Sequence, residues 1–89
     1  MTKRKLIVVA DDLGASESVN DGIIASFSEG IVTTSSLLVG MPNTDDGVKK
    51  AKQVNLPMGL HLRLTEGIPL TKGPIEVGLC DRGEFLRLH

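Results

Sequence analysis

Aromatic side chains are nearly absent from this sequence, which contains two phenylalanines, no tryptophan and no tyrosine among 89 residues. The core must therefore be built from Ile, Leu, Val and Met, and stacking platforms for bases or sugars are missing. The net charge of −1 gives no electrostatic attraction to nucleic acid or to an anionic membrane surface. We expect neither nucleic acid nor membrane as a partner.

Cysteine and long apolar runs are also scarce. The single Cys80 excludes an internal disulfide, so a reducing, cytoplasmic location is the expected one. No apolar run approaches the ~18 residues that a membrane-spanning helix needs. The basic start at residues 2–5 and the apolar residues 6–10 could suggest a secretion signal, but that run is short and meets two acids instead of a cleavage site.

What remains is the composition of an ordinary globular protein, with 40% hydrophobic and 24% charged residues. Eighty-nine residues amount to one small domain at most, and the count alone does not say whether the chain is complete.

Three segments have the pattern of β-strands. Residues 5–10 form a β-branched apolar run, typical of a strand covered on both faces in a parallel sheet. Residues 31–39 form the second segment, where small hydroxyl side chains alternate and predict a tightly filled interior. Residues 58–64 alternate with a period of two, which places four apolar side chains on one face and His61 and Arg63 on the other. We expect the apolar face of this strand to be packed.

Helical patterns separate these strands. Ser18, with Asp21 three residues later, is a capping signature for the start of the first helix. The second helix is predicted to start at Asn43 or Thr44 and to end at Asn55. Its two aspartates and three lysines are expected to form a capped, solvated face.

This order of elements predicts an α/β fold, a parallel βαβαβ unit with right-handed crossovers. Since its strands run in one direction, Asp11, Asp12 and His61 should meet at the carboxyl edge of the sheet, where α/β proteins carry their active sites. Residues 65–89 are expected to form a long irregular loop, with a hairpin from Ile75 to Leu88 that turns at Asp81-Arg82-Gly83.

Two carboxylates and an imidazole at one edge predict a metal site, because carboxylate oxygen suits Mg²⁺ or Mn²⁺ and imidazole nitrogen suits Zn²⁺. Adjacent strand residues point to opposite faces, so Asp11 and Asp12 are not expected to do the same work. One would bind the metal and the other would take a proton, a division that suits metal-assisted hydrolysis. Arg63, on the same face as His61, would either neutralise one of these acids or contact substrate.

Four motifs in consistent order resemble those of the YdjC-like carbohydrate deacetylases, the family that includes the chitooligosaccharide deacetylases. They are Ala10-Asp11-Asp12-Leu13-Gly14, Val19-Asn20-x-Gly22-Ile23, Gly30-x-Val32-Thr33 and Gly59-Leu60-His61-Leu62-x-Leu64-Thr65-x-Gly67-x-Pro69-Leu70. The resemblance implies that residues 1–89 are the N-terminal part, the first third, of a (β/α)-barrel domain related to polysaccharide deacetylases. It also implies a divalent metal at the carboxyl face, Mg²⁺ first and Zn²⁺ as the alternative.

The resemblance further implies roles for the predicted residues. His61 and Asp12 would be metal ligands and Asp11 the catalytic base, with the two aspartates exchanged as the alternative. The reaction implied is hydrolysis of an N-acetyl group from an amino sugar or chitooligosaccharide, which releases acetate and a free amine. An N-acetylated sugar is therefore the expected partner.

The chain departs from the family pattern at three points. Leu13 stands where phenylalanine is usual and Gly40 where asparagine is common. A second metal-binding histidine, expected well downstream, is absent from these residues, and His89 is not counted as its replacement. The residues would supply part of the site, so the isolated chain is expected to be inactive.

The sequence leaves two alternatives to an enzyme, a receiver-like signalling module and a non-catalytic fragment. Receiver domains of signalling proteins also hold Mg²⁺ with an acidic pair after the first strand, but they end the third strand in an aspartate that residues 58–64 lack. The other alternative is a non-catalytic fragment. In either case an unclosed sheet exposes apolar surface, which favours association of copies into a homo-oligomer unless further chain covers it.

Overall fold

The computed structural model describes residues 3–86 and contains a three-stranded parallel sheet in the order β1-β2-β3. The strands are β1 (Val9–Leu13), β2 (Thr34–Leu38) and β3 (Met58–His61). Helix α1 (Glu17–Ser28) connects the first two strands, and α2 (Thr44–Val54) connects the second and third. The predicted parallel βαβαβ order is confirmed.

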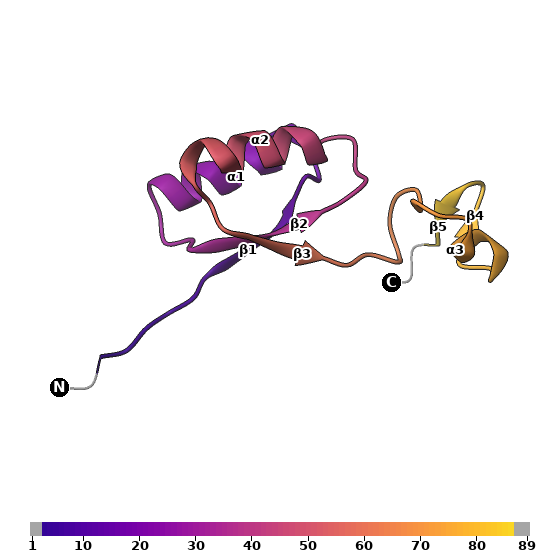
Figure 1. Cartoon of the computed structure of the whole chain (residues 1–89), viewed down its shortest axis with the longest axis horizontal. Coiled ribbons are helices and arrows are strands. Elements are labelled where there is room, and N and C mark those ends of the chain that lie inside the picture. The colour runs from indigo at the N-terminus through magenta and orange to yellow at the C-terminus, as the bar shows by residue number, and fades with distance from the viewer. Residues whose placement is uncertain (1–2, 87–89) are drawn as a thin grey trace.

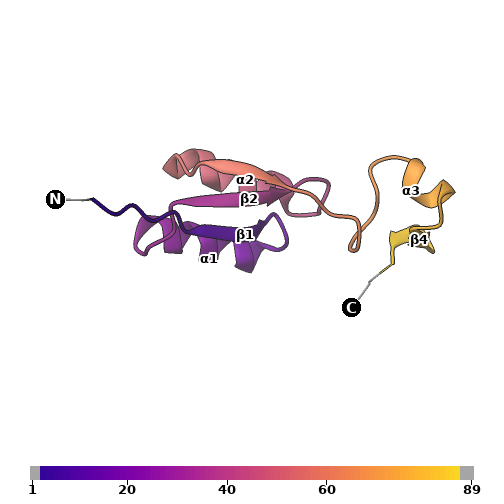
Figure 2. The same cartoon turned by 90° about the horizontal axis from the view of Figure 1, so that it is seen from below.

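Both helices lie on the same face of the sheet, as the two perpendicular views show (Figures 1 and 2). The core lies between the helices and the sheet and is formed by the buried side chains of Leu13, Ile23, Ala51 and Leu56. The expectation that the first strand is covered on both faces is wrong, because Val9 is 52% exposed. An apolar run indicates that a strand avoids water, but it does not say how many layers cover it.

The strands are shorter than their sequence patterns. Backbone pairing with β2 begins just before β1, at Val8, whose carbonyl oxygen accepts the N–H of Thr33 at 2.9 Å and that of Thr34 at 3.2 Å. Residues 3–7 extend away from the sheet (Figure 1), so the apolar residues among them have no neighbouring strand to pair with. At the other end, β3 stops at His61 because its register partner is Leu38, the last residue of β2.

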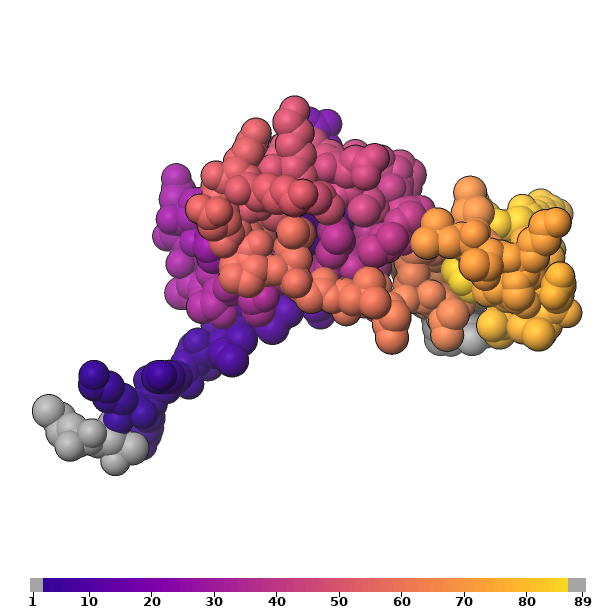
Figure 3. All heavy atoms as spheres, viewed as in Figure 1, coloured from indigo at the N-terminus to yellow at the C-terminus, as the bar shows by residue number. Residues whose placement is uncertain are grey.

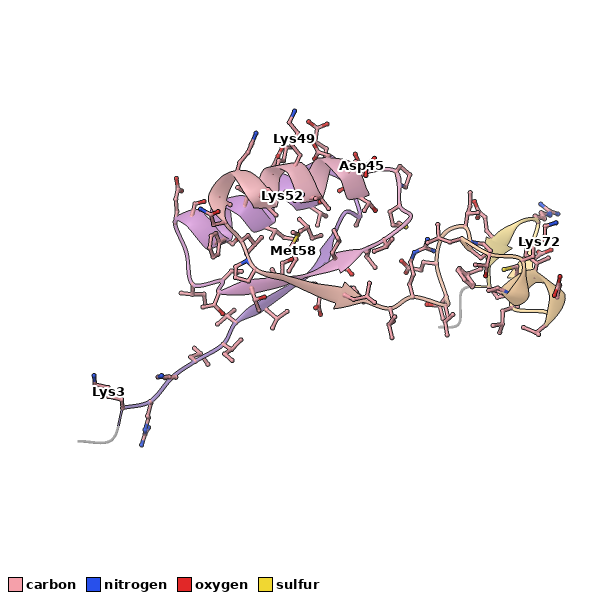
Figure 4. All side chains as sticks on the ribbon, viewed as in Figure 1. Lys3, Asp45, Lys49, Lys52, Met58 and Lys72 are labelled. Atoms are coloured by element: carbon pink, nitrogen blue, oxygen red, sulfur yellow. The ribbon has the colours of Figure 1, made fainter. Side chains whose placement is uncertain are left out.

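The apolar face predicted for residues 58–64 is not packed as expected. Met58 points from the strand toward the helix layer (Figure 4), but Leu60, Leu62 and Leu64 are 60% to 80% exposed. The helices contact mainly β1 and β2. The period of two therefore identified the correct faces, but no element in residues 3–86 covers the apolar one.

The N-cap of helix α1 lies two residues before the predicted cap. The N-cap is Ser16, which has an extended backbone and whose Oγ accepts the N–H of Val19 at 3.1 Å. Ser18 lies inside the first turn, so the prediction that it caps the helix is wrong. Helix α2 ends as expected at Asn55, which adopts the left-handed conformation with φ 58°.

A fully buried asparagine, Asn20, joins α1 to its surroundings. Its Oδ1 accepts the N–H of Gly14 at 2.7 Å, and its Nδ2 donates to Asn43 O and to Asp46 Oδ2, both at 3.0 Å. These bonds connect the segment after β1 with the first turn of α2. Asn20 belongs to the second of the four motifs, but its place in the motif does not predict these bonds.

Replacing Asn20 with alanine is expected to lower the free energy of unfolding by about 2 kcal/mol or more, because buried polar groups lose their partners. Urea unfolding followed by circular dichroism measures this. Asn43→Ala is the matched control, since the Asn43 side chain makes no capping bond, and it should change stability by about 0.5 kcal/mol or less. Equal losses in the two variants would contradict the role given to Asn20.

Lys50 forms an ion cluster between the two helices. Its Nζ lies 2.6 Å from Asp21 Oδ1 on α1 and 3.0 Å from Asp46 Oδ2 on its own helix. The charged residues of α2 were expected to form a solvated face. For Lys50 and Asp46 that expectation is wrong, because they form ion pairs. Hydrogen bonding to Asp21, and then to Asp46, raises the pKa of Lys50, and hydrogen bonds from Asn20 and then Lys50 lower the pKa of Asp46 below its ordinary 3.8.

Acid should therefore weaken the link between the helices. A carboxyl group whose folded pKa is lowered contributes stability above its unfolded pKa of about 3.8, and that contribution is lost as the pH falls through the folded value. We expect Asp46→Asn to reduce the fall in melting temperature between pH 5 and pH 2, about the window in which this group titrates. Asp45 lies on the exposed side of α2 (Figure 4), so Asp45→Asn should keep the original fall in melting temperature between pH 5 and pH 2. An identical fall in both variants and in the unsubstituted protein would contradict the prediction.

Residues 73–85 form a small unit beyond the carboxyl ends of the strands (Figures 1 and 3). It contains the short helix α3 (Gly73–Glu76) and the antiparallel pair β4 (Cys80–Asp81) and β5 (Glu84–Phe85). The hairpin turns as predicted, with Arg82 and Gly83 both at positive φ. It is shorter than the predicted hairpin, because α3 takes up residues 73–76, and Leu88 lies outside the described residues. No helix within residues 3–86 has the length and apolarity needed to cross a bilayer.

Candidate active site

The three predicted site residues lie at the carboxyl edge of the sheet. Asp12 Oδ1 is 3.2 Å from His61 Nδ1. Asp11 joins them through Ser36, whose hydroxyl donates to Asp11 Oδ1 at 2.8 Å and lies 3.3 Å from His61 Nδ1. The strands thus bring two carboxylates, a hydroxyl and an imidazole together.

The register of the strands explains why these side chains meet. In the parallel pair β2 and β3, Ser36 is opposite Gly59 and Leu38 is opposite His61. Side chains two residues apart point to the same face, so Ser36 and His61 both face away from the helices. Ser35 faces the helix layer, where it is buried and donates to Ala10 O at 2.6 Å.

The register of β1 shifts at the two aspartates. Ala10 is opposite Ser35 and Leu13 is opposite Leu37, so three steps along β1 match two along β2. Asp12 has φ 74°, a conformation that is uncommon for residues other than glycine. The expectation that strict alternation sends Asp11 and Asp12 to opposite faces is therefore wrong: the bulge brings both carboxylates into one cluster.

Ser36 is the site residue that sequence analysis missed. The alternating serines and threonines of residues 31–39 were interpreted as small side chains that fill an interior. The single hydroxyl hydrogen of Ser36 goes to Asp11, so toward His61 its oxygen can only accept. The imidazole tautomer with a proton on Nδ1 donates to this oxygen and to Asp12 Oδ1, whereas the other tautomer leaves Nδ1 with a lone pair that can bind a cation.

The distance between Asp12 Oδ1 and His61 Nδ1 can be tested against a metal site. Two atoms that each bind one cation at about 2.1 Å lie roughly 3.0 Å apart in octahedral and 3.4 Å apart in tetrahedral coordination. The observed 3.2 Å fits that range. The residues from 3 to 86 contain no group of three or more His, Cys, Asp and Glu side chains that could hold a metal. They would therefore supply two ligands, and water or further chain would fill the other positions.

A cavity of about 410 Å³ lies beside this pair. Its volume is within the range of small-molecule sites. Besides Asp12 and His61 it is lined by polar and apolar side chains from the ends of β2 and β3 and the segment that follows: Leu38, Met41, Leu62, Arg63, Leu64, Thr65 and Glu66. The described hydrogen bonds of Arg63 go to backbone carbonyls, so it does not neutralise Asp11 or Asp12 as one prediction had it.

The carboxyl edge of this parallel sheet thus carries an acid–imidazole cluster and a cavity. This is the arrangement of α/β proteins that bind a ligand or substrate at the carboxyl ends of their strands. The family model described as YdjC-like protein matches residues 5–88. The chain belongs to the YdjC-like family, as its motifs indicated.

Individual relatives agree with this assignment. A carbohydrate deacetylase of Vibrio cholerae is 47% identical over 68 residues, which are 75% of this chain and 27% of that protein. A carbohydrate deacetylase of Clostridium beijerinckii is 42% identical over 84 residues, 93% of this chain and 34% of that protein. A solved structure from Enterococcus faecalis, described as a candidate cellobiose-phosphate cleavage protein, matches with a TM-score of 0.84 and 30% identity, over 97% of this chain and 35% of its own.

The chain spans between about a quarter and a third of the length of the curated relatives it matches. Of the Enterococcus faecalis chain, 35% is covered. The comparison therefore concerns the part of the family that contains the two aspartates and His61.

Proposed function

We propose that this chain forms part of the site of a metal-dependent carbohydrate deacetylase, in which the whole protein removes an N-acetyl group from an amino sugar or chitooligosaccharide. The observation that carries the proposal is the cluster in which Asp12 Oδ1 lies 3.2 Å from His61 Nδ1 while Ser36 holds Asp11 beside them. The names of the relatives support the same activity.

In the proposed site Asp12 and His61 would hold a divalent cation, with Mg²⁺ as the first choice and Zn²⁺ as the alternative. A bound cation supplies a Lewis acid that polarises the acetamide carbonyl and acidifies water. Asp11 takes the proton from the attacking water, since its Oδ1 is oriented by the Ser36 hydroxyl. The proton then passes to the sugar nitrogen as the amide bond breaks, giving acetate and a free amine. The exchanged roles of Asp11 and Asp12 are the alternative that the experiments must separate.

The substrate is proposed to bind in the cavity beside Asp12 and His61. It contains the polar side chains of Thr65 and Glu66 next to His61, and these can bond to sugar hydroxyls. Stacking on an aromatic ring is not available among its lining residues. Recognition would therefore depend on hydrogen bonds and shape.

We further propose that this unit is the first third of a (β/α) barrel. Two observations support this: the strands stand in chain order, and both connecting helices lie on one face. Such winding curls a sheet toward closure, with the open face inside. Ser36 and His61 on the open face would then line the interior, and further helices would cover the exposed leucines among residues 60–64.

The activity test is acetate release from N-acetylated chitobiose. The whole protein is expected to release acetate when Mg²⁺ or Mn²⁺ is present and to stop when the cation is removed by a chelator. The 89-residue chain alone is expected to give no turnover, because it supplies only two of the metal ligands. No acetate from the metal-loaded whole protein would overturn the proposed activity, and turnover by the 89-residue chain would overturn the claim that the site is incomplete.

A further inference from the structure

Arg63 lies just beyond β3, and its guanidinium donates to four backbone carbonyls. Two of them follow β2: Nε bonds to Val39 O at 3.3 Å and Nη2 to Gly40 O at 3.4 Å. The other two follow Arg63 itself, with Nη1 bonded to Glu66 O at 2.5 Å and Nη2 to Ile68 O at 2.9 Å. The guanidinium thus ties together residues 39–40 and residues 66–68, two segments that are 26 or more positions apart in the chain.

Two glycines make room for this side chain. Gly40 has φ 78° and Gly67 has φ 77°, a region that glycine enters without the cost other residues carry. A Cβ atom on Gly67 would lie 2.8 Å from Arg63 Nη1, and one on Gly40 would lie 2.6 Å from Leu70 Cδ2 and 3.1 Å from Arg63 Nη2. A side chain at position 67 would therefore displace the guanidinium, whereas one at position 40 would first displace Leu70.

The hairpin unit is attached to the same cluster. The Phe85 ring is buried, with its centroid 5.7 Å from Arg63 Cζ. The backbone N–H of Phe85 donates to Gly67 O at 2.8 Å. The Phe85 amide proton therefore reports whether the segment around Gly67 is held in place.

These bonds shape the cavity beside Asp12 and His61, because Met41, Thr65 and Glu66 line it from the two segments that the guanidinium ties. A planar guanidinium can serve several carbonyls at fixed angles, which a lysine ammonium cannot do. We propose that Arg63 is a positioning residue: it holds residues 39–41 and 65–68 as a fixed wall of the cavity and so sets how tightly the sugar binds. The role in sugar binding rests on the proposed function.

The clamp itself is tested by amide hydrogen exchange in the 89-residue chain. Arg63→Met is expected to speed exchange at the Phe85 amide by at least about tenfold, with α1 amides unchanged, because only the local bonds are lost. Arg63→Lys should restore little of the protection. Unchanged exchange at Phe85, or an equal rise at every amide, would overturn the clamp.

A glycine pair provides the matched control. Gly67→Ala should reproduce the effect of Arg63→Met, since the new Cβ displaces the guanidinium. Gly78 has a similar φ of 81° but an added Cβ there meets nothing within 4 Å. Gly78→Ala introduces the backbone strain alone, so it should leave the Phe85 amide close to its original rate. Equal effects of the two alanines would contradict the contact with Arg63.

The functional part is tested in the whole protein by the kinetics of acetate release. Arg63→Met is expected to raise KM for N-acetylated chitobiose about tenfold, the effect of losing one good contact, and to change kcat and Mn²⁺ affinity little. A fall in kcat with unchanged KM would overturn this role. If the unsubstituted protein releases no acetate, the proposed function and the sugar-binding role fall together, while the Phe85 exchange still decides the clamp.

Discussion

Replacing His61 with alanine is expected to weaken Mn²⁺ binding by at least about tenfold, because losing even a residue that supports a metal ligand has that effect. The His61 side chain is one-third exposed and lies outside the core cluster. The substitution should therefore change the free energy of unfolding little. Isothermal titration of Mn²⁺ into the 89-residue chain and into the whole protein measures the affinity, and deacetylation by the whole protein should fall with it.

The control for this substitution is the other histidine of the chain. His89→Ala should keep the original Mn²⁺ affinity, because His89 is not among the proposed ligands. Equal affinity in the His61→Ala variant and the unsubstituted chain would contradict metal binding by His61. Loss of affinity together with unfolding would be visible by circular dichroism, and His61→Gln would then repeat the test with a side chain closer in size.

Amide substitutions at the two aspartates should separate their roles. Asp11→Asn in the whole protein is expected to lower kcat by about 10²- to 10⁴-fold, the contribution of general base catalysis, with Mn²⁺ affinity almost unchanged. Asp12→Asn is expected to lower Mn²⁺ affinity by at least about tenfold. Asparagine is chosen because it tolerates the positive φ of Asp12 as aspartate does.

The two variants serve as controls for each other, since each removes one carboxylate charge from the same cluster. The opposite result, with Asp11→Asn losing metal affinity and Asp12→Asn losing only kcat, would exchange the two roles. Full activity in the Asp11→Asn variant would contradict its function as a base. Ser36→Ala should resemble a weaker form of Asp11→Asn, because it removes the hydroxyl that orients that carboxylate.

The convergence of Asp11, Asp12 and His61 could be predicted from the sequence because parallel strands place their carboxyl ends at one edge. That argument needs only the direction of each strand, and it tolerates errors of several residues in the strand bounds. It holds even though β1 and β2 both begin later than their apolar patterns.

The bulge at Asp11 and Asp12 could not be predicted in the same way. Alternation assumes a regular ladder, whereas the shift in register depends on how β1 pairs with β2. Ser36 was overlooked for a related reason: serine in a strand has the same pattern whether it fills space or orients a carboxylate. Its role appears only when β1 and β3 are placed on either side of it.

Interactions with the backbone were equally hidden in the sequence. Arg63 bonds to four backbone carbonyls. Every residue has a backbone carbonyl, so the sequence does not indicate which of them accept these bonds. Its charge suggested an acidic partner, so the prediction looked to Asp11 and Asp12. The exposed leucines among residues 60–64 had a correct pattern, but a period of two does not say whether any element covers the face that they form.

The central claim is that Asp12 and His61 together bind a divalent cation, and paramagnetic broadening by Mn²⁺ in NMR spectra of the 89-residue chain tests it most directly. Mn²⁺ takes the same carboxylate and water ligands as Mg²⁺, and broadening detects even weak binding at a defined place. We predict that the amide signals of residues 11–13 and 60–62 broaden first, and that His61→Ala removes the effect. Broadening centred on the acidic first turn of α2, or no selective broadening at any Mn²⁺ concentration, would contradict the account.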